Sequence, residues 1–196
     1  SRLWQGQGRP EHALALLKAA LPNVARTVGR GDASRGRQVA PTAPLYTAMS
    51  DLHLQRGDPG QALAVLEEGM GELGQEIELL QALAAYYESR TEFARADEYY
   101  QQATRLYPDS AASYLASGGA LLGRGRVEEA LAAYERAADL EPLNANAFLA
   151  VGNVHRLMGQ SSEAIDNYSR ALELEPRLED AYLSLASVYR DGLSWW

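Results

Sequence analysis

The sequence repeats itself every 34 residues, and this period is the strongest constraint on what the chain can fold into. The clearest column is one of alanines, at Ala62, Ala96, Ala130 and Ala164. A second column is aromatic or apolar, at Tyr46, Leu80, Tyr114, Phe148 and Tyr182. A third holds small residues, at Ser50, Ala84, Gly118, Gly152 and Ala186. Because a unit this short cannot bury its apolar face alone, the period predicts a stack of units that cover one another.

Each unit is predicted to contain two helices. In residues 145–178, apolar and small residues recur at helical spacing from Phe148 to His155. Gly159 predicts the end of that helix, because glycine adopts the left-handed conformation at little cost. A second helix is predicted to begin near Ser161 or Ser162, and Pro176 prevents its continuation. The chain is therefore predicted to be all-α and built from antiparallel helix hairpins.

These columns resemble the signature of the tetratricopeptide repeat (TPR) family, in which aromatic, small and proline positions recur in a 34-residue frame. Residues 145–178 carry it as Phe148, Val151, Gly152, His155, Ala164, Tyr168, Ala171 and Pro176. Residues 111–144 carry it as Tyr114, Ser117, Gly118, Leu121, Ala130, Tyr134, Ala137 and Pro142. Residues 77–110 carry it as Leu80, Leu83, Ala84, Tyr87, Ala96, Tyr100, Ala103 and Pro108. Residues 43–76 match less well, because Leu66, Gly69 and Gly74 stand where the signature has the second aromatic, the second Ala and the Pro. The resemblance implies a right-handed α-solenoid.

The repeat frame also predicts how the chain is divided. We expect a truncated repeat, mainly its second helix, at 1–21 and a Gly- and Arg-rich insertion loop at 22–42. Four repeats follow at 43–76, 77–110, 111–144 and 145–178, and residues 179–196 form the first helix of a fifth, truncated repeat. Since the chain begins at Ser1 and inside a repeat, we expect it to be a piece of a longer protein. Trp195 and Trp196 then suggest continuation into another domain.

The charge is distributed unevenly. The net charge is −8, with +5 in residues 1–42 and −13 in the remainder. A body this acidic repels nucleic acid and anionic lipid, so we expect neither as a partner. The longest apolar runs are too short to span a membrane. We expect a soluble chain, in the cytoplasm or the cell envelope. Its single Lys against 17 Arg suggests a bacterial origin.

The residue types needed for catalysis or metal binding do not gather in the sequence. There is no Cys, and the three histidines are His12, His53 and His155. His53 and His155 occupy a packing column, and His12 has no second metal ligand at useful spacing. The segment "GGALLGRGR" at 118–126 spaces two glycines as a phosphate-binding loop does, but it lacks the Lys and the hydroxyl, and its period is helical. We therefore predict no cofactor, no metal and no enzymatic activity.

The resemblance implies that the first helix of each repeat lines a concave face on which peptides bind. The predicted groove residues are Thr47, Asp51, Gln81, Glu88, Leu115, Gly119, Leu122, Gly123, Leu149, Asn153, Arg156, Leu183 and Arg190. Leu115, Leu149 and Leu183 stand 34 residues apart. They form either an apolar ladder that a partner covers or side chains that fill space between repeats. On the first alternative, Leu149→Asp removes partner binding and leaves stability nearly unchanged.

Three polar or small residues of this set carry specific expectations. Asn153 is expected to hydrogen-bond a peptide backbone, because its amide offers both donors and an acceptor. Gly119 and Gly123 have no glycine counterpart in the other repeats. Glycine inside a helix costs about 0.5–1 kcal/mol relative to alanine, so we expect these two to deepen the groove.

The predicted function is a non-catalytic scaffold that binds a protein or peptide partner. Two alternatives remain open. The chain is the repeat arm of a larger enzyme or envelope-assembly protein, such as a glycosyl- or sulfotransferase, or it is a self-assembly module that forms homo-oligomers. A receptor for chaperone C-terminal tails is disfavoured, because the cations that such a site needs are missing from the corresponding positions.

Overall fold

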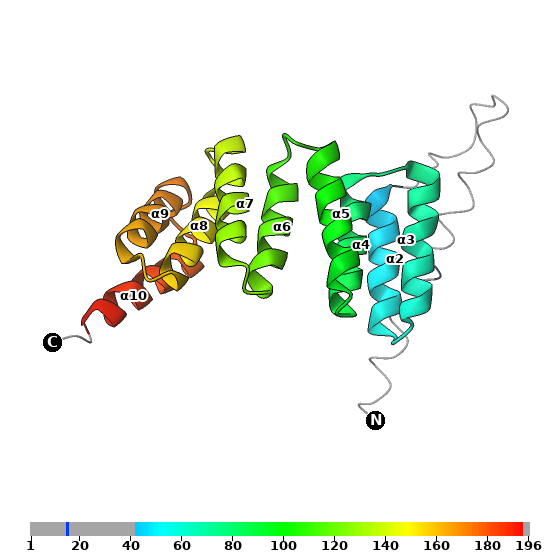
Figure 1. The fold of residues 1–196 in the computed structure, drawn as a ribbon, viewed down its shortest axis with the longest axis horizontal. Helices are drawn as coiled ribbons and strands as arrows, with labels where there is room; N and C mark the ends of the chain where they lie inside the picture. The colour runs from blue at the N-terminus through cyan, green and yellow to red at the C-terminus, as the bar shows by residue number, and fades with distance from the viewer. Residues whose placement is uncertain (1–14, 16–41, 194–196) are drawn as a thin grey trace. The chain divides into compact units, whose positions relative to one another are not determined.

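A computed structural model describes residue 15 and residues 42–193, and all regular structure in the range 42–193 is helical. The helices are α2 (Ala43–Gln55), α3 (Pro59–Leu73), α4 (Ile77–Ser89), α5 (Phe93–Leu106), α6 (Ala111–Gly123), α7 (Val127–Leu140), α8 (Ala145–Leu157), α9 (Ser161–Leu174) and α10 (Glu179–Leu193) (Figure 1). This confirms the predicted all-α class. All of the predicted segment 1–21 except residue 15, nearly all of the loop at 22–42, and Trp195 and Trp196 lie outside the described residues.

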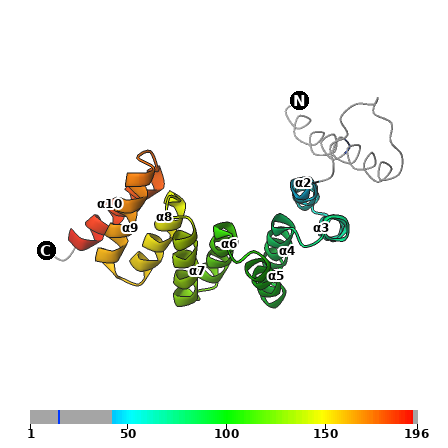
Figure 2. The same cartoon turned by 90° about the horizontal axis from the view of Figure 1, so that it is seen from above.

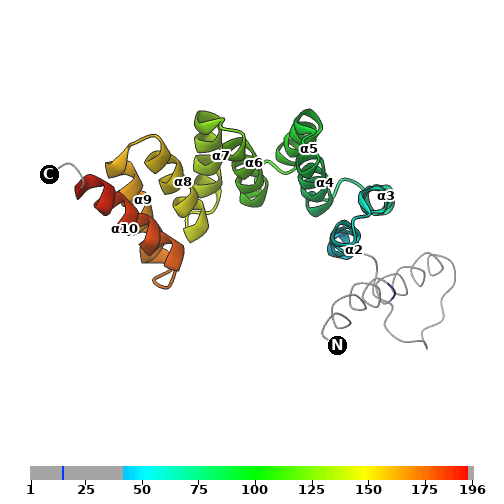
Figure 3. The ribbon, with the colours of Figure 1, turned by 90° about the horizontal axis from the view of Figure 1, so that it is seen from below.

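The chain divides into two compact units, at Glu92 and Phe93. Unit 1 contains α2, α3 and α4, which pack on one another. Unit 2 contains α5 to α10. Within unit 2 the hairpins α6–α7 and α8–α9 follow one another, and α10 lies against α8 and α9 (Figures 2 and 3). The hairpins α2–α3, α6–α7 and α8–α9 fall within the predicted repeats 43–76, 111–144 and 145–178, whose boundaries stay a prediction.

Three of the hairpins are closed by a small residue that receives a tyrosine ring. An ideal Cβ built on Gly118 lies 2.7 Å from the ring of Tyr134, and one on Gly152 lies 2.7 Å from the ring of Tyr168. In unit 1 the glycine lies on the second helix and the tyrosine on the first. An ideal Cβ built on Gly69 of α3 lies 2.8 Å from the ring of Tyr46 on α2. Contacts this short leave no room for a side chain, so the small-residue columns predicted from the sequence are a packing requirement.

The turn inside each hairpin places one residue in the left-handed region. Gly57, Gly125 and Gly159 have φ of 77°, 73° and 73°, as the glycine column predicts. The equivalent residue between α4 and α5 is Thr91, with φ of 60°. A β-branched residue is strained in this conformation, and the period alone did not identify it.

Candidate functional site

The predicted groove residues lie on the first helices of the hairpins. In unit 1, Thr47 and Asp51 lie on α2, and Gln81 and Glu88 lie on α4; Asp51 is exposed and the other three are half-buried. In unit 2 the set lies on α6, α8 and α10, as Leu115, Gly119, Leu122, Gly123, Leu149, Asn153, Arg156, Leu183 and Arg190. Nine of the thirteen predicted groove residues thus lie in unit 2, on three different helices.

The leucine ladder is uneven. Leu115 is half-buried and packs against Val151 and Val154 of α8 and their neighbours. Leu149 is half-buried and packs against two clusters, one containing Ala181 and the other Val188 of α10. Leu183 is 70% exposed. These contacts favour the space-filling alternative for Leu115, which α8 partly covers, and for Leu149, which α10 partly covers.

Asn153 is bound within the fold. Its Oδ1 accepts hydrogen bonds from the Tyr168 hydroxyl at 2.9 Å and from Ser184 Oγ at 3.3 Å. These bonds join α8 to α9 and α10. Asn153 was predicted to lie on the binding face; its bonds to Tyr168 and Ser184 were not predictable, because they depend on how α8 packs against α9 and α10.

Gly119 and Gly123 are exposed, and packing does not require either of them. An ideal Cβ on Gly119 meets the Tyr134 hydroxyl at 3.6 Å, which is ordinary van der Waals contact. A Cβ on Gly123 meets nothing within 4 Å. Both residues lie on one face of α6 together with Leu115 and Leu122, at helical spacing. The helical cost of these two glycines is therefore not offset by any close approach within the described residues.

The two arginines that follow these glycines are paired with acids. Arg124 is bound to Asp97, donates through Nε to the Ala120 carbonyl at 3.0 Å, and lies 5.6 Å from the centre of the Phe93 ring. Arg126 donates to Asp97 at 3.1 Å and to both Glu129 oxygens at 2.6 and 2.7 Å. The hydrogen bonds from Arg126 lower the pKa of the Glu129 carboxyl. Since α6 is helical from Ala111, both the backbone and the cations argue against a phosphate-binding loop.

Histidines and acids do not form a catalytic set in the described part of the chain, and His12 lies outside it. His53 is buried on α2, and His155 Nδ1 lies 2.7 Å from Gln160 Oε1. Within residues 42–193, three or more metal-ligating side chains do not converge at any point. A helix long and apolar enough to cross a membrane was likewise not found among the described residues.

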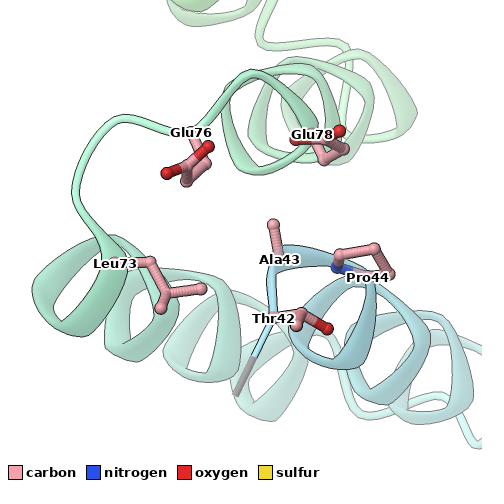
Figure 4. Close-up of a pocket in the computed structure, with 6 residues that line it drawn as sticks. All are labelled: Thr42, Ala43, Pro44, Leu73, Glu76 and Glu78. Atoms are coloured by element: carbon pink, nitrogen blue, oxygen red, sulfur yellow. The ribbon is translucent and has the colours of Figure 1, made fainter. Parts of the chain in front are cut away.

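Unit 1 contains a surface cavity of about 330 Å³ between the start of α2 and the α3–α4 turn (Figure 4). Its lining residues are Thr42, Ala43, Pro44, Leu73, Glu76 and Glu78. In Figure 4 the two carboxylates lie on one side, facing Ala43 and Pro44 on the other. The lining contains one hydroxyl and two carboxylates, and it contains neither a His nor a cation.

Comparison with known families matches most of the described chain to tetratricopeptide repeats. A model described as "TPR repeat" matches residues 118–159 and 152–191. Models described as "Tetratricopeptide repeat" match residues 43–68 and 77–110. No curated protein matches the chain.

Several solved structures share the fold. A structure from the functional characterization of Pseudomonas aeruginosa pilF is 24% identical, with a TM-score of 0.67, covering 78% of this chain and 70% of that one. A thermophilic TPR protein of Thermus thermophilus is 21% identical, with a TM-score of 0.64, covering 93% and 91%. A crystal structure of MamA is 24% identical, with a TM-score of 0.61, covering 74% and 84%. At these identities the likeness concerns the fold alone.

Proposed function

This chain belongs to the tetratricopeptide repeat family, and we propose that it is a non-catalytic scaffold that binds a peptide or helix along the first helices of its hairpins. The repeat fold is typical of interaction scaffolds. The proposed binding face in unit 2 is the α6 groove, which we define as Gly119, Leu122 and Gly123, with the partly covered Leu115 one helical turn before Gly119 and Arg156 on α8 at the position equivalent to Leu122.

The observation that carries the proposal is the pair Gly119 and Gly123. Gly119 lies inside α6, where a glycine costs helix stability, and Gly123 is the last residue of α6; both are exposed, and a side chain at either position meets open space or ordinary contact. Gly118, one residue away, shows the contrast, because its missing side chain makes room for Tyr134. A partner that approaches the backbone closely accounts for two such glycines on one face of a first helix, whereas Gly71, which is equally open, lies on the second helix α3.

A random dodecapeptide display library selected on the full chain tests the proposal. Binders are measured against Gly123→Arg, which puts a long side chain into the α6 groove without a clash. The matched control is Gly71→Arg, a glycine within α3 whose Cβ also meets nothing within 4 Å. We expect at least a tenfold loss of affinity for Gly123→Arg and little change for Gly71→Arg. Equal affinities for both variants would contradict the α6 groove.

Self-assembly is the second candidate, and exposed apolar side chains on α10 favour it. Tyr182, Leu183 and Tyr189 are 53%, 70% and 54% exposed, whereas Leu149, the equivalent of Leu183 one repeat earlier, is half-buried under α10. We expect Leu183→Lys to lower the mass that light scattering reports at high protein concentration. The matched control is Leu143→Lys, which changes a leucine that is 80% exposed between α7 and α8. A wild-type chain that stays monomeric over the series counts against this candidate.

The proposal that the chain is the arm of a larger enzyme or envelope-assembly protein is compatible with either mode of binding. It places the same α6 groove beside a catalytic or assembly partner. Determining the sequence of the full-length gene product tests it directly.

A further inference from the structure

The tyrosine hydroxyl at the floor of the α6 groove lacks a partner within the described part of the chain. Tyr134 on α7 is only 7% exposed, and the structure gives its hydroxyl no hydrogen bond to any described residue. That hydroxyl lies 3.6 Å from the position of a Cβ on Gly119. Burial raises the pKa of Tyr134, so the group remains a neutral O–H donor at physiological pH. The ring is buried, whereas the hydroxyl is not fully enclosed, so it can donate to a ligand beside Gly119.

The next repeat shows what fills the same place. Tyr168 is the equivalent of Tyr134, and its hydroxyl donates to Asn153 Oδ1 at 2.9 Å. Ser184 Oγ donates to the same oxygen at 3.3 Å. The positions 34 residues earlier hold Gly119 and Ala150, which offer no side-chain polar atom. Ala150 packs in the cluster that contains Tyr134. The α6–α7 hairpin thus keeps the tyrosine but lacks the amide oxygen that accepts its hydrogen bond in the α8–α9 hairpin, and Ala150 lacks the hydroxyl by which Ser184 holds that amide.

We propose that the space over Gly119, beside the Tyr134 hydroxyl, is a binding subsite for an amide carbonyl oxygen of a bound peptide. The peptide oxygen takes the place that Asn153 Oδ1 occupies in the next repeat and accepts the hydrogen bond from Tyr134. The inference rests on the proposed function, since it names the chemistry that the α6 groove recognises.

The neighbouring charges favour a neutral amide over a carboxylate. The internal occupant of the equivalent place is itself an uncharged amide. Arg124 and Arg126, which follow Gly119 and Gly123 in the chain, are paired with Asp97 and Glu129. An incoming carboxylate would compete with those acids for its countercharge. Glycine at position 119 also lets a peptide backbone approach the helix closely. The amide comes either from the peptide backbone or from an Asn or Gln side chain.

A four-variant cycle tests the geometry without any ligand. Gly119→Asn supplies Tyr134 with the internal acceptor that Asn153 supplies to Tyr168, and we expect it to raise Tm by about 2–4 °C. In a Tyr134→Phe background the gain should shrink to that of helix propensity alone. Gly123→Asn is the matched control, because its Cβ meets nothing within 4 Å and it gains no such bond. An equal gain with and without the hydroxyl would overturn the proposed pairing.

Binding of the library-selected peptides then separates the subsite from the groove. We expect Gly119→Asn and Tyr134→Phe each to weaken binding by about tenfold, and Gly71→Arg to leave it unchanged. Alanine scanning of the peptide distinguishes the two sources of the amide. If replacing one Asn or Gln abolishes binding, the side-chain amide is bound; if no such replacement does, the backbone carbonyl is bound. If Gly123→Arg blocks binding while Gly119→Asn and Tyr134→Phe bind normally, the groove stands and the subsite is wrong. If the library yields no binder, the proposed function fails and the subsite with it.

Discussion

Thr91 adopts the left-handed conformation that the turn of the repeat requires, and its β-branched side chain is strained in that conformation. Its φ of 60° matches the glycines at the equivalent turns, and its amide donates to the Glu88 carbonyl at 2.8 Å as Gly125 donates to Leu122 at 2.9 Å. The left-handed conformation costs an L-residue roughly 1–2 kcal/mol. The turn hydrogen bonds hold Thr91 in place despite that strain.

We therefore predict that Thr91→Gly stabilises the fold. The relief of strain outweighs the added entropy of the unfolded chain, for a net gain of about 1 kcal/mol. Urea unfolding followed by circular dichroism measures it. Gly159→Thr is the reciprocal control and should lose a similar amount, because Gly159 has φ of 73°. A loss of stability in Thr91→Gly would show that the threonine is not strained.

Single residues also mark where the sequence was informative and where it was not. The glycine column predicted the left-handed turns at Gly57, Gly125 and Gly159, because only backbone geometry decides them. The roles of Arg124 and Asn153 were not predictable. Arg124 pairs with Asp97 and Asn153 with Tyr168 and Ser184, and each pairing joins helices whose facing residues depend on the packed structure.

At the scale of elements, the α2–α3 hairpin is closed by a buried tyrosine and an acid. The Tyr46 hydroxyl donates to Glu72 Oε2 at 2.7 Å. Burial first, and then the hydrogen bond and negative charge of Glu72, raise the pKa of Tyr46 well above its ordinary value near 10. In the unfolded chain the same group ionises near pH 10, so the unfolded state binds fewer protons above that pH.

The contribution of Tyr46 to stability is accordingly complete below about pH 10 and is lost as the pH rises further. We predict that the free energy of unfolding falls between about pH 10 and 11 and that Tyr46→Phe falls less steeply. Urea titrations at fixed pH values measure the two slopes. Identical slopes for the two chains would contradict the raised pKa.

Leu149 on α8 and Leu183 on α10 occupy equivalent positions, and we predict that their replacement changes stability by different amounts. Leu149→Asp places a charge between α8 and α10, where Leu149 packs against the clusters of Ala181 and Val188, and we expect a loss of about 2–4 kcal/mol. Leu183→Asp changes a side chain that is 70% exposed and should cost less than about 0.5 kcal/mol. Chemical unfolding of both variants checks the pair. If the Leu149→Asp chain is stable but no longer binds peptides, the result would instead support the alternative in which a partner covers the apolar ladder.

The period explains why the elements were predictable to this extent. Helix type, the turn near Gly159 and the start of α9 near Ser161 follow from local spacing and turn residues, although the N-cap Gln160 makes no side-chain cap hydrogen bond. The burial of Leu115 and Leu149 does not, because those residues lie at the junction between one hairpin and the next. A surface position and a junction position have the same spacing within a single helix.

For the whole molecule, the family assignment rests on matches across both units, at 43–68, 77–110 and 118–191. The acidic balance of residues 43–196 and the paired state of Arg124 and Arg126 argue against a phosphate-bearing partner. The proposed α6 groove of unit 2 offers two glycines that packing does not explain and the hydroxyl donor of Tyr134. The proposed function and the proposed subsite therefore both depend on where on the chain a peptide binds.

Mapping the site of a selected peptide by amide chemical-shift changes in the full-length chain tests this claim most directly. If the α6 groove is the binding site, we expect the largest changes at Gly119, Gly123, Tyr134 and the adjoining part of α8. Changes confined to α3 or to the exposed side of α9 around Arg170, with Gly119 and Tyr134 unmoved, would contradict it.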